Sequence, residues 1–338
     1  MELEMFIRKR YQTLLAVSLL PFLSTGAAYH VSKEPQTKHI LFEEATGIEC
    51  TSCPMIAPDI EKIGSTYPGT NIIAIHGHHY RNSFFDLTTP GGDEIVDYFD
   101  IMSYPQAMVN RRKFDNMDRR FMSSVFWPPF LASENETDAP VNLWINSWLN
   151  EETGIVKVEV EGYCLADISA ENPYLTVVMT QDGLIGPQKG QSMPSYTHNH
   201  VLRDFITPTW GIPITNTLRG DYFSVSFDYP LPEKIGIYEV VPGNLKFIAF
   251  VTEEKINVMN STSSTVTYEP PEVLPDDPDD DDFITGVRKI ADAPDSYSIY
   301  DLNGRLILQS NTPDIPSSLS SGIYIMKSHD SVSKLIVP

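Results

Sequence analysis

Two cysteines separated by two residues, Cys50 and Cys53, are the residues of this sequence best suited to chemistry. They lie between a strand-like run over 39–45 and a helix-like run over 54–67. Backbone N–H groups at the start of a helix favour negative charge, so a cysteine there ionises readily to the thiolate that exchanges disulfides. We expect a small, exposed Cys50–Cys53 disulfide, with Cys50 as the attacking sulfur and Cys53 as the resolving one.

The same pair allows two other interpretations. A CxxC pair is half of a zinc site, but no second CxxC and no suitably spaced Cys/His pair accompanies it, so we predict neither a metal nor a cofactor here. A passive local disulfide is the other alternative. Glu49 precedes Cys50, and a neighbouring carboxylate disfavours the thiolate form of a cysteine.

Tyr104-Pro105 is the second element of interest. An exchange site needs a backbone edge along which an extended substrate can lie, and X–Pro bonds can adopt the cis form. A trans proline that opens a strand is the ordinary alternative, since most X–Pro bonds are trans. We therefore take Tyr104 as a candidate substrate-binding residue and Pro105 as a candidate site residue.

The elements around these residues alternate between strand and helix. After the CxxC helix we expect a strand over 71–76, a helix over 92–99, a strand over 106–110 and a closing helix over 117–131. Such alternation predicts an α/β layer. From 139 to 268 short β-like runs replace the helical period, which predicts an antiparallel β-sandwich carrying a long loop over 183–218.

The chain divides into five predicted parts. The first is a signal peptide over 1–28, with a basic start, a short apolar run and a small-residue cleavage site. The others are an α/β domain over 29–138, a β-sandwich domain over 139–268, an acidic Pro/Asp linker over 269–286 and a C-terminal β-domain over 287–338. No later segment approaches the roughly 20 apolar residues of a membrane-spanning helix. We predict an exported protein without a spanning segment.

The charge of the chain limits its partners. The formal net charge is −21, and eight of the acidic residues lie between 269 and 282. A nucleic-acid-binding surface needs clustered Lys and Arg, so we predict no nucleic-acid partner. The run Asp279–Asp282 could hold calcium, but it lacks the glycine and distal glutamate of an EF-hand loop. A solvated linker explains that run without a ligand.

Four histidines form two further candidate groups. His76 and His78 would project to one side if their strand continued, as two metal ligands do. No third ligand is identifiable, so we expect exposed or hydrogen-bonded histidines. His198 and His200 also share one face of a predicted strand, where we expect a structural polar cluster with Asn199 and Arg203.

The third cysteine, Cys164, lies in an alternating strand pattern over 156–165. Pairing of Cys50 with Cys53 would leave it free. We predict a buried and inert thiol at this position.

Several motifs resemble a known family. The stretch 43–54 with its CxxC pair, Ile75-His76-Gly77, Tyr104-Pro105 and Val109-Asn110-Arg111 is similar to the Omp28-related outer-membrane proteins of Bacteroidetes, with weaker likeness through 196–203 and 247–251. The resemblance covers roughly 38–265. It implies a thioredoxin-like N-terminal domain in which Cys50 and Cys53 are the redox pair and Pro105 is the cis-proline.

The C-terminal part resembles another element, the type A sorting domain of the type IX secretion system. Tyr300–Arg305, Leu319, Gly322–Ile325 and Lys334–Val337 carry that likeness, and Asn303-Gly304 is a strong hairpin turn. The resemblance implies contact with the type IX secretion machinery. The expected fold class is thus an α/β thioredoxin-like domain, an all-β sandwich domain and a small C-terminal β-sandwich sorting domain.

Two functions remain open at this point. The first is thiol–disulfide exchange on extracytoplasmic protein or peptide substrates, by a protein of the outer membrane, the cell surface or the secreted fraction. The second is a non-enzymatic surface binding or adhesion protein in which the Cys50–Cys53 disulfide is structural. The sequence therefore leaves the question of an enzyme undecided.

Overall fold

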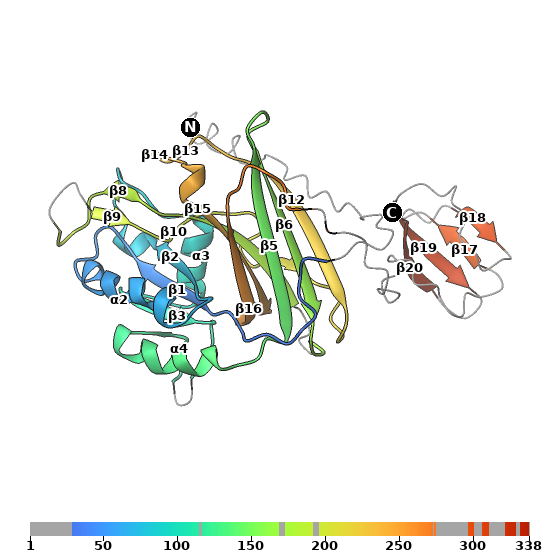
Figure 1. Cartoon of the computed structure of the whole chain (residues 1–338), viewed down its shortest axis with the longest axis horizontal. Helices are drawn as coiled ribbons and strands as arrows, with labels where there is room; N and C mark the ends of the chain where they lie inside the picture. Colours follow the sequence, from blue (N-terminus) through green and yellow to red (C-terminus); the bar gives the residue numbers. More distant parts are fainter. Residues whose placement is uncertain are drawn as a thin grey trace. The chain divides into compact units, whose positions relative to one another are not determined.

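The structure is a computed structural model that describes residues 29–114, 117–168, 173–191, 196–272 and 274, together with four C-terminal strands (Figure 1). The predicted signal peptide, most of the acidic linker and the Asp279–Asp282 run lie outside the described residues. The described residues fall into two compact units, one over 29–272 and one that holds the C-terminal strands.

Most of the regular structure of the first unit is β-sheet. In chain order its elements are β1 (Leu41–Thr46), α2 (Cys53–Thr66), β2 (Asn71–His76), η1 (His78–Tyr80), α3 (Pro90–Tyr98), β3 (Gln106–Val109), β4 (Phe121–Met122), η2 (Ser124–Phe126), α4 (Trp127–Asn135), β5 (Val141–Asn150), β6 (Ile155–Cys164), β7 (Pro173–Gln181), β8 (Leu184–Gly186), β9 (Tyr196–His198), β10 (Val201–Phe205), β11 (Ile212–Pro213), β12 (Tyr222–Pro230), β13 (Lys234–Ile235), β14 (Tyr238–Glu239), η3 (Pro242–Asn244), β15 (Leu245–Glu253) and β16 (Ile256–Thr265).

One nine-stranded sheet runs through this unit. Its strands lie in the order β16-β15-β7-β10-β2-β1-β3-β4, and β11 pairs with β7. β1 pairs with β2 in parallel and with β3 in antiparallel orientation. A parallel pair needs a crossover connection, which α2 supplies. The sheet takes strands from both sides of residue 138, so the expected α/β and sandwich parts share one sheet.

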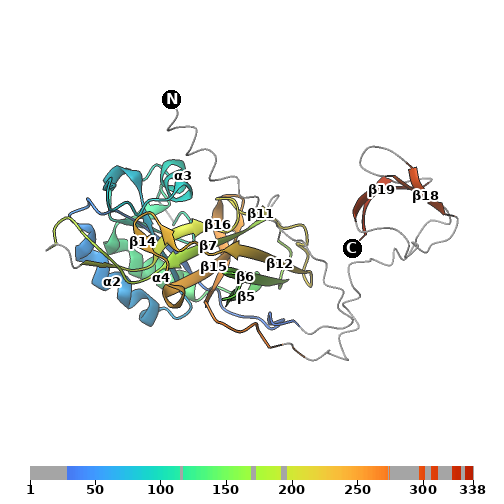
Figure 2. The same ribbon diagram turned by 90° about the horizontal axis from the view of Figure 1, so that it is seen from above.

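Three layers cover this sheet. Ile60 and Ile63 of α2 pack with Trp127 and Leu131 of α4 against one face of β1, β2 and β3, and Ile95 and Val96 of α3 pack on the opposite face. A separate three-stranded sheet, in the order β12-β6-β5, shares a core with β7 and β15. Figure 2 shows these three strands as a layer beside β15. Alternate side chains of each covered strand therefore enter different cores.

Local sequence explains where the helices next to the site begin. Pro54 stands in the first turn of α2, where its missing N–H costs nothing. Thr89 is the N-cap of α3, and its side chain accepts a hydrogen bond from the backbone N–H of Gly92 at 3.0 Å. The two helix starts are thus specified by their own residues.

Two predicted elements differ from the structure. The helix expected over 117–131 begins only at Trp127, because Phe121 and Met122 pair with Met108 and Ala107 of β3 instead. The loop expected over 183–218 contains β8, β9, β10 and β11. Of these, β10 is a strand within the large sheet, between β7 and β2. Its neighbours are distant in sequence, so local patterns did not reveal it.

The second unit is a four-stranded antiparallel sheet. Its strands are β17 (Tyr297–Tyr300), β18 (Leu306–Ser310), β19 (Gly322–Ser328) and β20 (Val332–Val337), in the order β18-β17-β19-β20. The expected pairing of the first two strands is present. The predicted Asn303-Gly304 turn and Leu319 lie outside the described residues.

Among the described residues, no helix has the length and apolar character that crossing a membrane requires.

Candidate functional site

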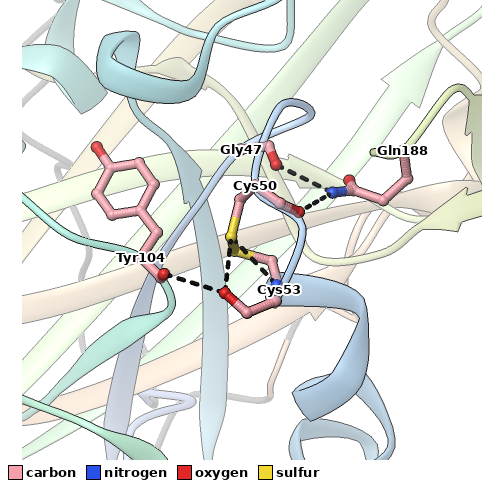
Figure 3. Close-up of a disulfide and its surroundings, with 6 residues drawn as sticks. Gly47, Cys50, Cys53, Tyr104 and Gln188 are labelled. Atoms are coloured by element: carbon pink, nitrogen blue, oxygen red, sulfur yellow. Dashed lines mark hydrogen bonds between the residues drawn. A yellow bond between two sulfur atoms is a disulfide. The ribbon is translucent and has the colours of Figure 1, made fainter. Parts of the chain in front are cut away.

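The CxxC pair lies at the junction of β1 and α2. Cys50 lies in the loop after β1, Cys53 is the first residue of α2, and their sulfurs form a disulfide with the two Cα atoms 5.5 Å apart. The backbone N–H of Cys53 donates to Cys50 Sγ at 3.1 Å. Figure 3 shows this contact. The Ser52 hydroxyl lies 3.7 Å from the same sulfur. In the reduced protein the Cys53 N–H would stabilise a Cys50 thiolate.

The disulfide is buried, so the expectation of an exposed pair is wrong. Cys50 is 1% exposed and Cys53 4% exposed, and both belong to the core formed with α3. The reason is a tertiary contact with the segment 187–191, which follows β8 and lies over the CxxC loop. We call this segment the cap.

Three hydrogen bonds hold the cap in place. Gln188 Nε2 donates to the backbone oxygens of Gly47 at 3.1 Å and Cys50 at 2.8 Å, as Figure 3 shows. The backbone N–H of Lys189 donates to the oxygen of Ile48 at 2.8 Å. Gln188 is 4% exposed. The cap therefore supplies donors to the buried carbonyl groups of the CxxC loop, of which Gly47 O also accepts from the backbone N–H of Cys50 at 3.0 Å.

The next residue of the cap has to be glycine. Gly190 has a φ of +87°, and a Cβ atom there would lie 2.9 Å from the backbone oxygen of Thr51. Lys189 also brings its Nζ to 3.7 Å from Glu49 Oε2, and Asn82 donates to Glu49 Oε1 at 2.8 Å. Glu49, the residue expected to oppose a Cys50 thiolate, is thus already engaged by an ammonium and an amide.

The Tyr104–Pro105 bond is cis, as the family resemblance implied. Ser52 Oγ donates to the backbone oxygen of Tyr104 at 3.5 Å, which places this edge beside the disulfide. The Tyr104 ring is buried and turns away from the sulfurs in Figure 3. It packs on Tyr80 with ring centroids 4.8 Å apart. A ligand at this edge would meet backbone atoms rather than the tyrosine ring.

A polar cavity of about 50 Å³ lies behind the disulfide. Glu44 of β1, His76 of β2 and His198 of β9 line it together with Cys53. The Glu44 carboxyl is fully buried, and this burial raises its pKa to about 8, against a smaller opposing effect of the Thr46 hydroxyl. A carboxyl group that is mostly protonated at neutral pH therefore shares a cavity with the inner sulfur.

The two cavity histidines are neutral. Burial lowers the pKa of His76 well below its usual value, and His198 and Arg203 lower it further. Burial lowers the pKa of His198 to about 4, although a hydrogen bond to the Pro187 oxygen acts in the opposite direction. The imidazole rings meet edge to face, with centroids 5.4 Å apart, and His76 Nδ1 has no protein partner. A cavity of this size has room for a water molecule at that atom.

The histidines that the sequence grouped together lie in different surroundings in the structure. His76 enters the cavity, whereas His78 lies in η1 near Asp93 and Asp97, so the two do not form a pair. His198 contacts His76, and His200 lies in a turn with φ +57° near Asp182 and Glu61. His198, Asn199 and His200 nevertheless line the same cavity. The expected shared face of His76 and His78 is absent because the strand ends at His76 and η1 begins at His78.

Cys164 is free and buried, as expected. Burial, and to a lesser extent Asp221, raise the pKa of its thiol to about 12. It is therefore unreactive at neutral pH.

Sequence reasoning missed two residues of this site. The sequence did carry a signal for Glu44, because it is one of two adjacent acidic residues in a predicted strand. Charged residues are rare in buried strands, so such a pair indicates a buried acid. Glu43, its neighbour, points to the other face and binds Arg111 through two hydrogen bonds of 2.6 and 2.7 Å. Gln188 carried no local signal, because its partners lie 138 and 141 positions away.

Much of this chain matches a known protein family. The family described as outer membrane protein Omp28 matches residues 92–269, more than half of the chain. The chain belongs to the Omp28 family. This membership confirms the expected location at the outer membrane or cell surface. The matched range covers β3 to β16 and the Tyr104-Pro105 edge, whereas the CxxC pair lies before it.

Two solved structures are similar to this Omp28 family member. HBP35 of Porphyromonas gingivalis is 16% identical, with a TM-score of 0.56 over 89% of this chain and 99% of that one, which is a likeness of fold. A domain of the outer membrane lipoprotein Omp28 from Porphyromonas gingivalis is 18% identical over 39% of this chain and 92% of that one, with a TM-score of only 0.28. Among curated proteins no relative matches.

Proposed function

We propose that this Omp28 family member is an extracytoplasmic thiol–disulfide exchange protein with a thioredoxin-like domain. The order of β1, α2, β2, α3, β3, β4 and α4 supports the thioredoxin-like assignment, as does the strand order β2-β1-β3-β4 with only β1 and β2 parallel. The observation that carries the proposal is the disulfide at the start of α2, beside the Tyr104–Pro105 edge and in front of Glu44.

The first step uses the oxidised pair seen in the structure. A substrate thiolate attacks Cys50 Sγ, a substrate–Cys50 disulfide forms, and the Cys50–Cys53 bond breaks with its electron pair on Cys53. The protonated Glu44 carboxyl gives its proton to the Cys53 thiolate across the shared cavity. Its raised pKa makes Glu44 a suitable acid near neutral pH.

The second step releases the product. A second substrate thiolate attacks the substrate sulfur of the mixed disulfide, so the substrate is oxidised by two electrons and the Cys50 thiolate leaves. The N–H of Cys53 that already contacts Cys50 Sγ stabilises this thiolate. Run in reverse, the same steps reduce a substrate disulfide, with Cys50 as attacker and Cys53 as resolver.

The burial of the disulfide favours a second candidate function. Cys50 and Cys53 are 1% and 4% exposed under the cap, so exchange requires the cap to open. A surface binding protein with a permanently closed, structural disulfide needs no such opening. An exchange site needs a disulfide that thiols can reduce, whereas a structural disulfide resists reduction.

The reduction potential of the pair tests the two functions. We expect equilibration with thiol redox buffers, followed by acid quench and labelling, to give a value between about −180 and −270 mV. A value below about −300 mV is typical of structural disulfides and would support the binding protein instead.

Trapping of mixed disulfides then tests the roles of the two sulfurs. Cys53→Ala leaves Cys50 without a resolving partner, so we expect it to accumulate covalent complexes with exported proteins. Cys50→Ala is the matched control, because it keeps one site cysteine and the buried Cys164 but removes the attacker. Equal yields of complexes from both variants would contradict the assignment of Cys50.

The remaining predicted parts complete this proposal. We infer that the α/β part over 29–138 carries the exchange site and the sandwich part over 139–268 supplies the cap. The four-stranded sheet of the second unit supports a sorting domain over 287–338, following a linker over 269–286. Its partner would be the type IX secretion machinery, reached after a signal peptide over 1–28 is removed.

A further inference from the structure

A histidine–carboxylate cluster lies at the surface where η1 meets α3. His78 and His79 come from η1, and Asp97 comes from α3. One ligand atom from each of these three residues lies within 4.8 Å of the others. Two imidazoles and a carboxylate are a donor set that zinc uses in proteins.

A second carboxylate orients the first histidine. Asp93 Oδ1 accepts a hydrogen bond from the backbone N–H of His78 at 2.9 Å and lies 3.4 Å from His78 Nδ1. His78 Nε2 faces Asp97 Oδ1 at 3.6 Å. With Nδ1–H directed at Asp93, the lone pair of Nε2 is free to bind a metal. This carboxylate–histidine arrangement is the one that commonly holds metal-binding histidines in position.

The side chains that would have to adjust are free to do so. Zinc–nitrogen bonds of about 2.1 Å place the ligand atoms of a tetrahedral site about 3.4 Å apart, so the cluster must contract slightly. His79 and Asp97 are exposed and His78 is half-buried, so the side chains of the outer two have room to rotate toward His78. Solvent can supply the remaining ligand.

We propose that His78, His79 and Asp97 bind a divalent metal ion of borderline softness, with Zn²⁺ as the reference ion, and that Asp93 is a positioning residue. Imidazole nitrogens disfavour the hard ions Ca²⁺ and Mg²⁺, which take oxygen ligands. The His79 ring lies 6.3 Å from the Tyr104 ring, so the ion would lie near that ring, on the side that turns away from the disulfide. The site does not depend on the redox activity of the cysteines.

Zinc binding by the full exported chain tests this site. The protein is stripped with a chelator and Zn²⁺ is titrated against a chromophoric competitor at neutral pH. We expect saturable binding that excess Ca²⁺ does not displace. His78→Ala and Asp97→Asn should each weaken it at least tenfold, and Asp93→Asn about tenfold through the loss of orientation. Asp97 is an exposed side chain, so its variant keeps the fold.

His200→Ala is the matched control. This histidine also has two neighbouring carboxylates, but Asp182 lies at its Nδ1 and Glu61 at its Nε2, so the three cannot surround one ion. We expect His200→Ala to bind Zn²⁺ as the wild type does. The proposal is overturned if the wild type binds no Zn²⁺, if His78→Ala and Asp97→Asn keep its affinity, or if His200→Ala loses as much.

Discussion

Glu44 is the residue whose environment departs furthest from what its type prefers. It lies in a strand buried on both faces, and among the described contacts only the Thr46 hydroxyl eases its ionisation. The neighbouring carboxylate of Glu43 is also buried, but Arg111 neutralises its charge through two hydrogen bonds. An isolated buried carboxyl of this kind is costly to the fold and is commonly a functional group.

Glu44 should make the stability of the protein depend on pH. Its pKa is about 8 in the folded chain against 4.5 for the ordinary group, so between these values the folded state holds a proton that the unfolded state has lost. The free energy of unfolding therefore falls as pH rises through this window. We expect the wild type to lose stability relative to Glu44→Gln between about pH 5 and 8, measured by urea denaturation.

The neutral histidines act with the opposite sign. The pKa of His198 is lowered to about 4, so the unfolded chain binds more protons than the folded one up to the ordinary pKa of 6.5, and stability rises with pH there. His76 acts in the same direction. Both histidines are present in the wild type and in Glu44→Gln, so the difference between the two proteins isolates the carboxyl. A difference that stays flat across the window would contradict the raised pKa of Glu44.

At the scale of elements, the cap controls access to the disulfide. It belongs to the connection between β8 and β9, whereas the disulfide belongs to the connection between β1 and α2. The two are held together by side-chain and backbone hydrogen bonds rather than by strand pairing. Such a contact can open without disrupting the large sheet, because local segments unfold at lower free energy than a core.

Gln188→Ala should speed reduction of the disulfide. The change removes the side-chain donor of Cys50 O and one of two donors of Gly47 O, which also accepts from the backbone N–H of Cys50. Leaving the buried Cys50 oxygen without its donor costs about 1 to 3 kcal/mol and favours the open cap. We expect reduction by a small thiol to become roughly 5-fold to 150-fold faster, since 1.4 kcal/mol corresponds to a factor of about ten. The rate is measured by labelling the released thiols.

Gln191→Ala is the control for that experiment. Gln191 has the same side chain three positions later, but it is exposed. It should be reduced at the wild-type rate. Equal rates for Gln188→Ala and Gln191→Ala would show that the cap hydrogen bonds do not limit access to the disulfide.

At the scale of the whole molecule, the large sheet links the CxxC region to the β-rich region. Val201 of β10 pairs with Ala74 of β2, and β10 also pairs with β7. Asn260 of β16 accepts a hydrogen bond from the backbone of His39 and donates to Val141 O. These contacts join the beginning, middle and end of the range 29–272.

We therefore expect one cooperative unfolding transition for the first unit. Its described α-helices all precede residue 136, so far-ultraviolet circular dichroism follows the region around the CxxC pair. Cys164 is fully buried in β6, so its labelling by a thiol reagent follows the β-rich region. With the CxxC pair kept oxidised, the two probes should give the same urea midpoint. Separate midpoints would mean that 29–138 and 139–268 unfold as independent domains.

Local patterns in the sequence were enough to predict the elements around the CxxC pair. β2 has the predicted bounds, and α2 begins beside the predicted Pro54, because apolar periodicity and a proline in the first turn act over a few residues. The disulfide followed from cysteine spacing alone. The family resemblance added the cis bond at Tyr104–Pro105.

Only the tertiary structure decided how these residues can act. Gln188 of the cap binds the Cys50 carbonyl, Glu44 shares a cavity with His76 and His198, and His78 lies beside Asp97. Each of these arrangements brings together segments that are separated in the sequence. Burial and the pKa shifts that follow from it depend on such contacts, which sequence periodicity does not contain. The sequence by itself determined that a redox-capable pair stands at the start of a helix. The packing of β-rich segments against that helix determined that the pair is enclosed, with a buried acid behind it.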